Sequence, residues 1–184
     1  VESLLEMVAS AEPRYHALID TGALVTGLSN EGVARKLLSF SAMAKWCEGI
    51  VFLNESDEKM ILIKATGRVL KLSQCGIAVE QRFAFYDQIH TTGMDIKHCL
   101  SARAALTLGK DMVFRDLAQG AFRMRGIGEG QTITLLVIPE VQELLQRELT
   151  KTGPSGGRAM VDTSDSSEAK SRAALLDVTA WLVI

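Results

Sequence analysis

The chain has 184 residues, of which 47% are hydrophobic and 23% are charged, and its formal net charge at pH 7 is −2. This composition supports a domain with a substantial core and excludes a chain that is disordered as a whole. The slightly negative charge argues against a protein whose main role is nonspecific binding of nucleic acid, although a local basic patch stays open.

Membrane, disulfide and metal proteins are also disfavoured. No apolar run approaches the roughly 18 residues that a membrane span needs, so we expect no membrane contact. Cys47, Cys75 and Cys99 are too few and too irregularly spaced for a disulfide scaffold or a four-ligand zinc site, and we expect no metal site. The first residues lack the basic and apolar regions of a signal peptide. We therefore expect a cytoplasmic or nuclear protein that is not secreted.

Apolar patterns predict strands alternating with helices. The predicted strands are short apolar runs, and they lie at residues 15–20, 49–53, 60–63, 69–72, 83–86, 104–108 and 132–138. The predicted helices have apolar residues at helical spacing, and they lie at residues 2–11, 30–46 and 114–122 and from Pro139 onward. The third and fourth strands flank Thr66-Gly67, as the strands of a hairpin would.

Continuous apolar strands with helices between them are typical of a mostly parallel sheet covered on both faces. We therefore predict an α/β domain with three layers over residues 15–150, and we assign residues 1–14 to a helix from a preceding region. Residues 151–171 are rich in Gly, Ser, Thr and Asp, which predicts a disordered linker. Residues 172–184 then begin a further element. Because the chain starts without methionine and stops within an apolar run, we expect a fragment of a longer protein.

The segment from Phe83 to Gln131 carries two motifs. The strand at 83–86 is followed by Gly93-Met94-Asp95-Ile96, and the helix at 114–122 leads into a glycine-rich turn. In order and spacing, these motifs resemble the fifth and sixth motifs of the second RecA-like lobe of superfamily-two helicases. The resemblance implies a RecA-like architecture, with ATP and Mg²⁺ as the cofactors of the complete motor. It also implies a nucleotide-binding role for five residues, Gly93, Asp95, Gln119, Arg123 and Arg125.

The chain departs from that family at several positions. Arg125 comes two residues after Arg123, where the family usually has three, and Phe122 stands where glycine is common. Asp87 and Gln88 replace the usual Thr-Asp pair. The sequence has no Gly-x-x-x-x-Gly-Lys-Ser/Thr loop to cradle a triphosphate. We therefore expect no cofactor in this chain and no hydrolysis of nucleotide by it alone, and we expect its partner to be an upstream lobe of the same polypeptide.

Longer stretches resemble a second family. ALIDTGALVTGLSN, YDQIHTTGMDIKH, and LTLGKD with FRDLAQGAFRMRGIGEGQTITLLVIPE look like parts of very large proteins of fungi, protists and algae, whose C-terminal regions are domains of unknown function. Many members of that family are assigned as ubiquitinyl hydrolases, which are thiol proteases of the ubiquitin conjugation pathway. The resemblance covers residues 15–149. It implies that the parent protein is a ubiquitinyl hydrolase whose partners are ubiquitin or ubiquitinated proteins.

A thiol protease needs a thiolate, a histidine to activate it and a group to orient that histidine. Cys75, His90 and Asp87 are the available set. Three functions stay open: the ubiquitinyl hydrolase, the second lobe of a nucleotide-dependent helicase-like translocase, and a degenerate lobe that binds only protein. We expect the site at the carboxyl ends of the central strands, where the Asp87–Asp95 loop should face Arg123 and Arg125. The carboxylate of Asp95 or Asp87 should accept hydrogen bonds from the guanidinium group of one of these arginines.

Overall fold

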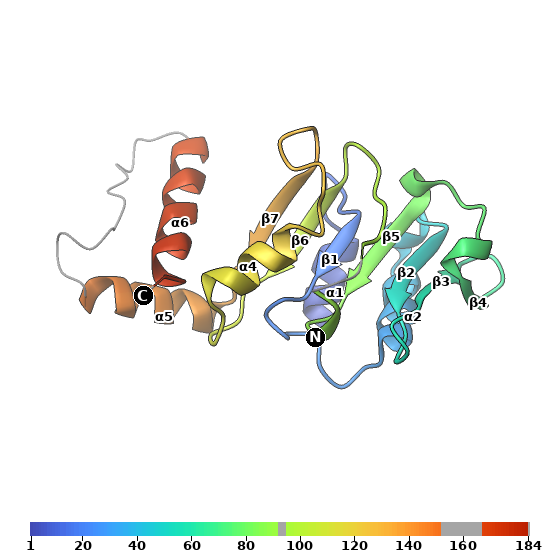
Figure 1. Ribbon diagram of the computed structural model, residues 1–184, viewed down its shortest axis with the longest axis horizontal. Helices are drawn as coiled ribbons and strands as arrows, with labels where there is room; N and C mark the ends of the chain where they lie inside the picture. The colour runs from blue at the N-terminus through green and yellow to red at the C-terminus, as the bar shows by residue number, and fades with distance from the viewer. Residues whose placement is uncertain (92–94, 152–166, 184) are drawn as a thin grey trace.

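The computed structural model describes residues 1–91, 95–151 and 167–183, and within them a seven-stranded sheet lies among helices (Figure 1). The strands are β1 (Ala17–Ile19), β2 (Gly49–Leu53), β3 (Lys59–Ile63), β4 (Val69–Lys71), β5 (Arg82–Tyr86), β6 (Arg103–Thr107) and β7 (Thr132–Leu136). The helices are α1 (Glu2–Ala9), α2 (Asn30–Ser39), α3 (Ser41–Ala44), α4 (Phe114–Ala121), α5 (Pro139–Lys151) and α6 (Ser167–Trp181). Short 3₁₀ turns lie at Leu72–Gln74, Val79–Gln81 and Ile89–Thr91.

The sheet is mixed but mostly parallel. Its strand order is β4-β3-β2-β5-β1-β6-β7. Strands β2, β5, β1, β6 and β7 are parallel, and the β2–β3–β4 meander adds two antiparallel pairs at one edge. The prediction of an α/β domain with a mostly parallel sheet is confirmed. Strand β5 is internal, because it pairs with β2 on one side and with β1 on the other.

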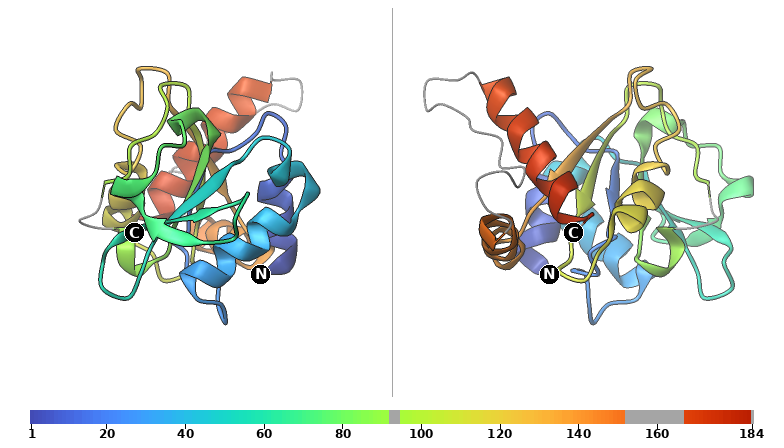
Figure 2. Two further views of the ribbon diagram at one scale, coloured as in Figure 1. Left: turned by 90° about the vertical axis from the view of Figure 1, so that its right-hand side faces the viewer. Right: turned by 60° about the vertical axis from the view of Figure 1, so that its left-hand side comes forward.

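Each central strand contributes side chains to two hydrophobic cores, because successive side chains of a strand point to opposite faces of the sheet. In β1, Ala17 and Ile19 face one core, and Leu18 faces the other. Helices α1 and α2 cover the core that contains Leu18, and α4 covers the other. Figure 2 shows α1 and α4 on opposite sides of the sheet. Strands β1, β2, β5 and β6 are buried on both faces, which explains why their sequences are continuous apolar runs.

Two helical regions differ from the sequence prediction. The helix expected over 30–46 is two helices, because Phe40 is extended between α2 and α3. At that break Ser39 Oγ donates to the Lys36 carbonyl (2.6 Å), and such local bonds compete with helix continuation. Helix α1 buries Leu5 and Val8 in the same core as α2, so residues 1–14 belong to this domain and not to a preceding region.

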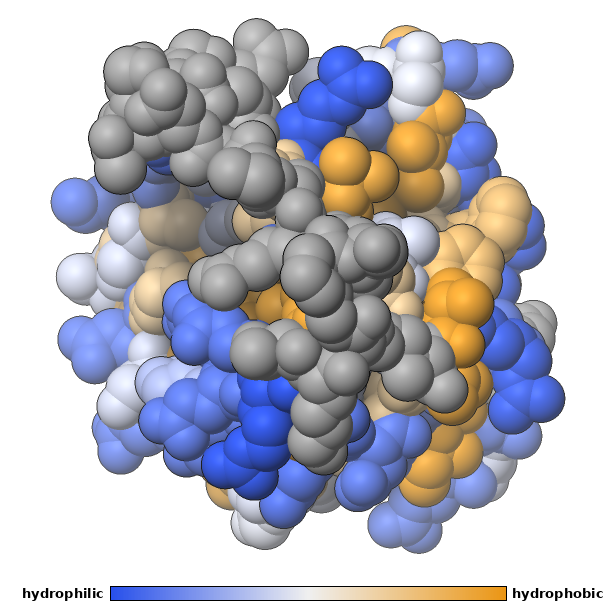
Figure 3. All heavy atoms as spheres, turned by 90° about the vertical axis from the view of Figure 1, so that its left-hand side faces the viewer, coloured by the Kyte–Doolittle hydropathy of each residue, from blue (hydrophilic) through white to orange (hydrophobic). Residues whose placement is uncertain are grey.

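The predicted linker at 151–171 lies largely outside the described residues. Residues 167–171 are described, and they form the first part of α6, so this helix starts before the element that we expected at 172. The segment Ser-Glu-Ala-Lys-Ser contains strong helix formers, which accounts for the earlier start. Helix α6 packs with α5 beyond β7, and Figure 3 shows hydrophobic surface on this side of the molecule.

Two glycines hold the ends of β1 and β6 together. A Cβ on Gly22 would lie 2.6 Å from the carbonyl carbon of Leu108 and 2.7 Å from the amide nitrogen of Gly109. A Cβ on Gly109 would in turn lie 2.8 Å from the carbonyl oxygen of Gly22. Because the neighbouring atoms are backbone, they cannot turn aside as a flexible side chain would.

We predict that Gly22→Ala lowers the free energy of unfolding by about 1–3 kcal/mol, because the added methyl group forces the two segments apart. Gly76→Ala is the matched control, since a Cβ at Gly76 would meet nothing within 4 Å. Urea denaturation of both variants and the wild type measures the effect. If Gly22→Ala and Gly76→Ala were equally stable, this would contradict the close backbone contact between Gly22 and Gly109.

Candidate functional site

A crevice opens at the carboxyl ends of β1, β5 and β6. Strands β1 and β5 are neighbours, and the segments that follow them pack on opposite faces of the sheet. Such a position is where open α/β sheets bind ligands. The crevice has a volume of about 560 Å³. The segments that line it follow these strands, belong to α4 or directly precede α5, and they include Thr21–Leu24, Gln88, Thr91, Gly109–Met112, Asp116, Gln119 and Ile138.

Asp20 shapes one wall of this crevice. Its side chain is buried, with the residue 1% exposed. Its carboxylate accepts hydrogen bonds from the amides of Leu24 (3.0 Å) and Val25 (2.8 Å) and from the hydroxyl of Thr107 (2.6 Å). The Thr107 oxygen also accepts from the Gly22 amide (3.0 Å). Asp20 therefore fixes the loop after β1 and ties it to β6, a role that the sequence analysis missed.

Thr21 places a free hydroxyl beside the crevice. The residue is 3% exposed, and its Oγ1 has no hydrogen-bond partner among the described residues. Helix α4 approaches it closely at Gly120, where a Cβ would lie 2.5 Å from Thr21 Oγ1. A buried hydroxyl without a partner is rare in folded proteins. Among the described residues, the Thr21 hydroxyl is therefore a buried polar group without a partner, between β1 and α4.

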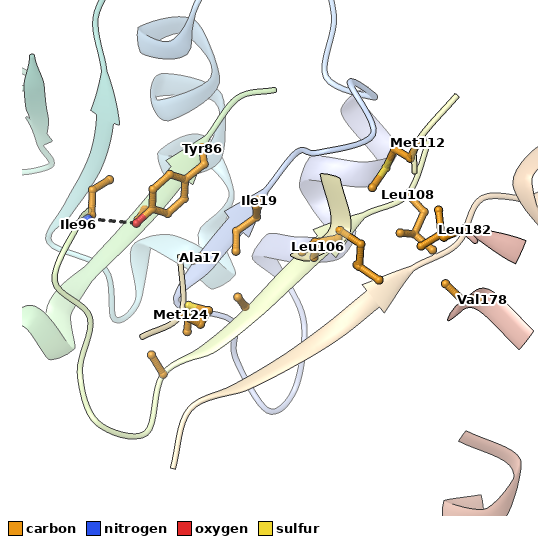
Figure 4. Close-up of a cluster of buried hydrophobic side chains, with 14 of the residues drawn as sticks. Ala17, Ile19, Tyr86, Ile96, Leu106, Leu108, Met112, Met124, Val178 and Leu182 are labelled. Carbon is orange, nitrogen blue, oxygen red and sulfur yellow. Dashed lines mark hydrogen bonds between the residues drawn. The ribbon is translucent and has the colours of Figure 1, made fainter. Parts of the chain in front are cut away.

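The predicted residues divide between two places. Gln119 lines the crevice, as do Gln88 and Thr91 of the loop after β5. Arg123 and Arg125 do not line it, which corrects the expected position of the arginines at the carboxyl edge. The reason is that α4 ends above Thr21, where Gly120 meets it, and the chain that follows the helix continues toward the start of β1. Figure 4 accordingly shows Met124 close to Ala17, and the two residues share one core.

The two arginines meet Asp95 instead. Arg125 forms a fork on the carboxylate, with Nη2 2.8 Å from both oxygens and Nε 3.1 and 3.2 Å from them. Arg123 Nη1 donates to Asp95 Oδ1 (3.1 Å), and Arg123 Nε lies 3.4 Å from the carbonyl oxygen of Gln119. The expected contact between the two motifs is therefore present, and Asp95, not Asp87, holds the fork.

Exposure separates the two arginines. The side chain of Arg123 is 8% exposed, whereas those of Arg125 and Asp95 are 58% and 54% exposed. Hydrogen bonds from Arg125 lower the pKa of Asp95, and the charges of Arg125 and Arg123 lower it further against a smaller opposing effect of burial. One carboxylate thus accepts hydrogen bonds from two guanidinium groups.

Buried polar groups support the segment that carries Asp95. The amide of Ile96 donates to the hydroxyl of Tyr86 (3.3 Å, Figure 4), and that hydroxyl lies 3.0 Å from His98 Nε2. Burial lowers the pKa of His98 to about 4 and raises that of Tyr86. With His98 neutral, its Nε2 can accept a hydrogen bond from the Tyr86 hydroxyl, which itself accepts from the Ile96 amide, and these two bonds fix the backbone next to Asp95.

The predicted thiol site is not assembled. Cys75 Sγ accepts from the amide of Ile77 (3.4 Å), and Ile77 reaches toward Gly49, the first residue of β2. His90 follows the carboxyl end of β5, so the two residues lie toward opposite ends of the sheet. His90 does contact Asp87 through Nδ1, but its Nε2 lies 2.9 Å from Asp57 Oδ1 and so faces a carboxylate and not a thiol. The proposed triad is wrong because its cysteine is elsewhere.

The other cysteines offer no alternative thiolate next to His90. Cys47 is buried and donates to the Gly49 carbonyl (3.3 Å), and burial raises the pKa of its thiol to about 11. Cys99 is buried at the start of the segment that leads to β6. Within the described part of the chain, no group of three or more His, Cys, Asp or Glu side chains is arranged to hold a metal ion. Gly93, the remaining predicted site residue, lies outside the described residues.

The described residues also contain no helix that is long and apolar enough to span a membrane.

Comparison with known proteins gives no relative. No family model matches the chain, and no curated protein or solved structure matches it at a significant level.

The protonation of His98 gives a testable pH dependence. As the pH falls below 6.5, the unfolded chain takes up a proton on His98, whereas the folded chain does so only near pH 4. Stability should therefore decline across this interval, by about 1–3 kcal/mol from this residue. In His98→Gln, whose amide oxygen can still accept from Tyr86, that contribution should vanish.

Urea unfolding at several pH values between 7 and 4 compares the two proteins, and all other titrating groups cancel in the difference. We expect the wild type to lose stability relative to His98→Gln as the pH falls. A difference that does not change with pH would contradict the assignment of a buried, neutral His98.

Proposed function

We propose that this chain is the second, RecA-like lobe of a nucleotide-dependent two-lobe module of the helicase or translocase kind. In this proposal an upstream lobe of the same polypeptide binds ATP and Mg²⁺, and Arg125 reaches the triphosphate from this lobe. The observation that carries the proposal is the Arg125 fork on Asp95, which is exposed, preformed and shared with a second arginine.

The division between the arginines suits such a role. Arginine remains charged and offers a planar fork that matches phosphate oxygens. Arg125 is more than half exposed, so moving it from Asp95 to a phosphate costs little, because exposed ion pairs contribute only about 0–1 kcal/mol. Asp95 would keep its bond to the buried Arg123 during that exchange. The Asp95 carboxylate therefore holds Arg125 in an extended position at the surface.

The fold and the sequence support the same proposal. The sheet is mostly parallel, and β5, which precedes the Asp95 segment, lies inside it. The chain has no phosphate-binding loop of its own, so in this proposal the triphosphate is bound by the other lobe. An arginine supplied from a second unit can accelerate phosphoryl transfer by neutralising charge in the transition state.

The ubiquitinyl hydrolase implied by family resemblance receives no support from the site geometry. Cys75 and His90 lie toward opposite ends of the sheet, and His90 is engaged by two carboxylates. If the parent protein is a thiol protease, its nucleophile must come from a pair other than Cys75 and His90. The nucleotide-dependent module is therefore the function that the geometry supports best.

We predict that Arg125→Ala, in the polypeptide that carries both lobes, slows hydrolysis of nucleoside triphosphate by about 10³-fold, the effect of losing an arginine finger. Steady-state phosphate release measures the rate, and circular dichroism shows whether the fold is intact. Arg35→Ala is the matched control. Arg35 is also an exposed arginine in an ion pair, with Glu31 on α2, and it lies far from the Asp95 segment in the sequence.

An unchanged rate in Arg125→Ala would contradict the proposal and favour a degenerate lobe that binds protein. A wild-type polypeptide that hydrolyses no nucleotide but labels with a thiol-reactive ubiquitin probe would favour the hydrolase.

A further inference from the structure

A second crevice lies at the same edge of the sheet, beside the ends of β2 and β5. Its volume is about 720 Å³. The start of α2 and the β2–β3 turn form two of its walls, and the loop after β5 forms the third. His90 and Asp57 line it from opposite segments that are 33 residues apart in the sequence. This contact joins the turn to the loop.

His90 uses both ring nitrogens on carboxylates. Nδ1 is bonded to Asp87 Oδ1, and Nε2 lies 2.9 Å from Asp57 Oδ1. A neutral imidazole has only one N–H group, whereas imidazolium has two. Two carboxylate acceptors are therefore satisfied together only when the ring is protonated. A single metal ion cannot take the place of the proton, because the two ring nitrogens point in divergent directions.

We propose that Asp57, His90 and Asp87 form a proton-dependent latch that fastens the β2–β3 turn to the loop after β5. When the ring loses a proton, Nδ1 keeps its N–H on Asp87, and Nε2 presents a lone pair to Asp57. The bond to Asp57 is then lost, and the turn is released from the loop.

The environment decides which of the two bonds breaks. Asp87 is held near the ring because it also accepts from the His90 amide (3.3 Å), and its side chain is only 23% exposed. The side chain of Asp57 is 73% exposed, so water can replace the ring as its partner. The turn keeps its own shape after release, because Asn54 Oδ1 accepts from the amides of Ser56 (3.0 Å) and Glu58 (2.8 Å).

The other charged groups around the crevice do not replace His90 as a partner of Asp57. They are Glu31 at the start of α2 and Glu55 in the turn, both carboxylates, with Asp87 on the loop itself. Nearby Glu58 is already paired with Lys71 (2.6 Å). None of the described residues that line the crevice is a lysine or an arginine. The latch also touches the first crevice, because Ile89, which precedes His90, lines both.

Backbone ¹⁵N relaxation of the protein tests the latch, with the His90 ring resonances followed in the same titration between about pH 5 and pH 8, the interval in which histidines change charge. We expect the order parameters of residues 55–57 to fall from about 0.85 to below about 0.6 as the ring deprotonates.

Asp57→Asn removes this dependence, because an amide can accept from an N–H or donate to a bare ring nitrogen. Asparagine also tolerates the positive φ of 58° at this position. In Asp57→Asn we therefore expect the turn to stay ordered at both ends of the titration. Glu55→Gln is the control and should behave as the wild type. Equal order at both ends in the wild type, or an unchanged response in Asp57→Asn, would overturn the proposal.

Discussion

Asp95 accepts hydrogen bonds from two arginines that follow α4, and this shared carboxylate connects the two parts of the domain that matter for its proposed role. The segment after β5 carries Asp95, and the segment between α4 and β7 carries Arg123 and Arg125. Tyr86 and His98 fix the first segment from beneath, through a hydrogen bond to the Ile96 amide. The pair is thus built on buried structure, although Asp95 and Arg125 themselves are exposed.

The carboxyl edge of the sheet is organised separately. Asp20 shapes the loop after β1, and Gly22 lets this loop touch the segment after β6. Gln119 connects the crevice with the arginines, since Gln119 lines the crevice and its carbonyl oxygen lies 3.4 Å from Arg123 Nε. Helix α4 therefore borders the crevice with Asp116 and Gln119, and the two arginines follow its end. A ligand in the crevice would contact α4, and a phosphate at Arg125 would contact the segment that directly follows this helix.

Local sequence patterns predicted the elements well and the site only in part. Apolar runs gave the strands, because strands buried on both faces have no other composition. The predicted contact of Asp95 with Arg123 and Arg125 is present because the segment after β5 and the segment after α4 lie over the same face of the sheet. The triad failed because Cys75 and His90 are near each other in sequence but separated along β5. Asp57 was missed as the partner of His90 because nothing local links a hairpin turn to a loop 33 residues later.

The central claim is that Arg123 stabilises the fold, whereas Arg125 can leave Asp95 to contact a phosphate. Unfolding free energies of Arg123→Met and Arg125→Met test it directly, since methionine keeps the apolar stem and removes the charge. We expect Arg123→Met to lose about 2–3 kcal/mol, because a buried charge-assisted hydrogen bond is removed. Arg125→Met should lose less than about 1 kcal/mol. Equal losses, or a larger loss in Arg125→Met, would contradict the account.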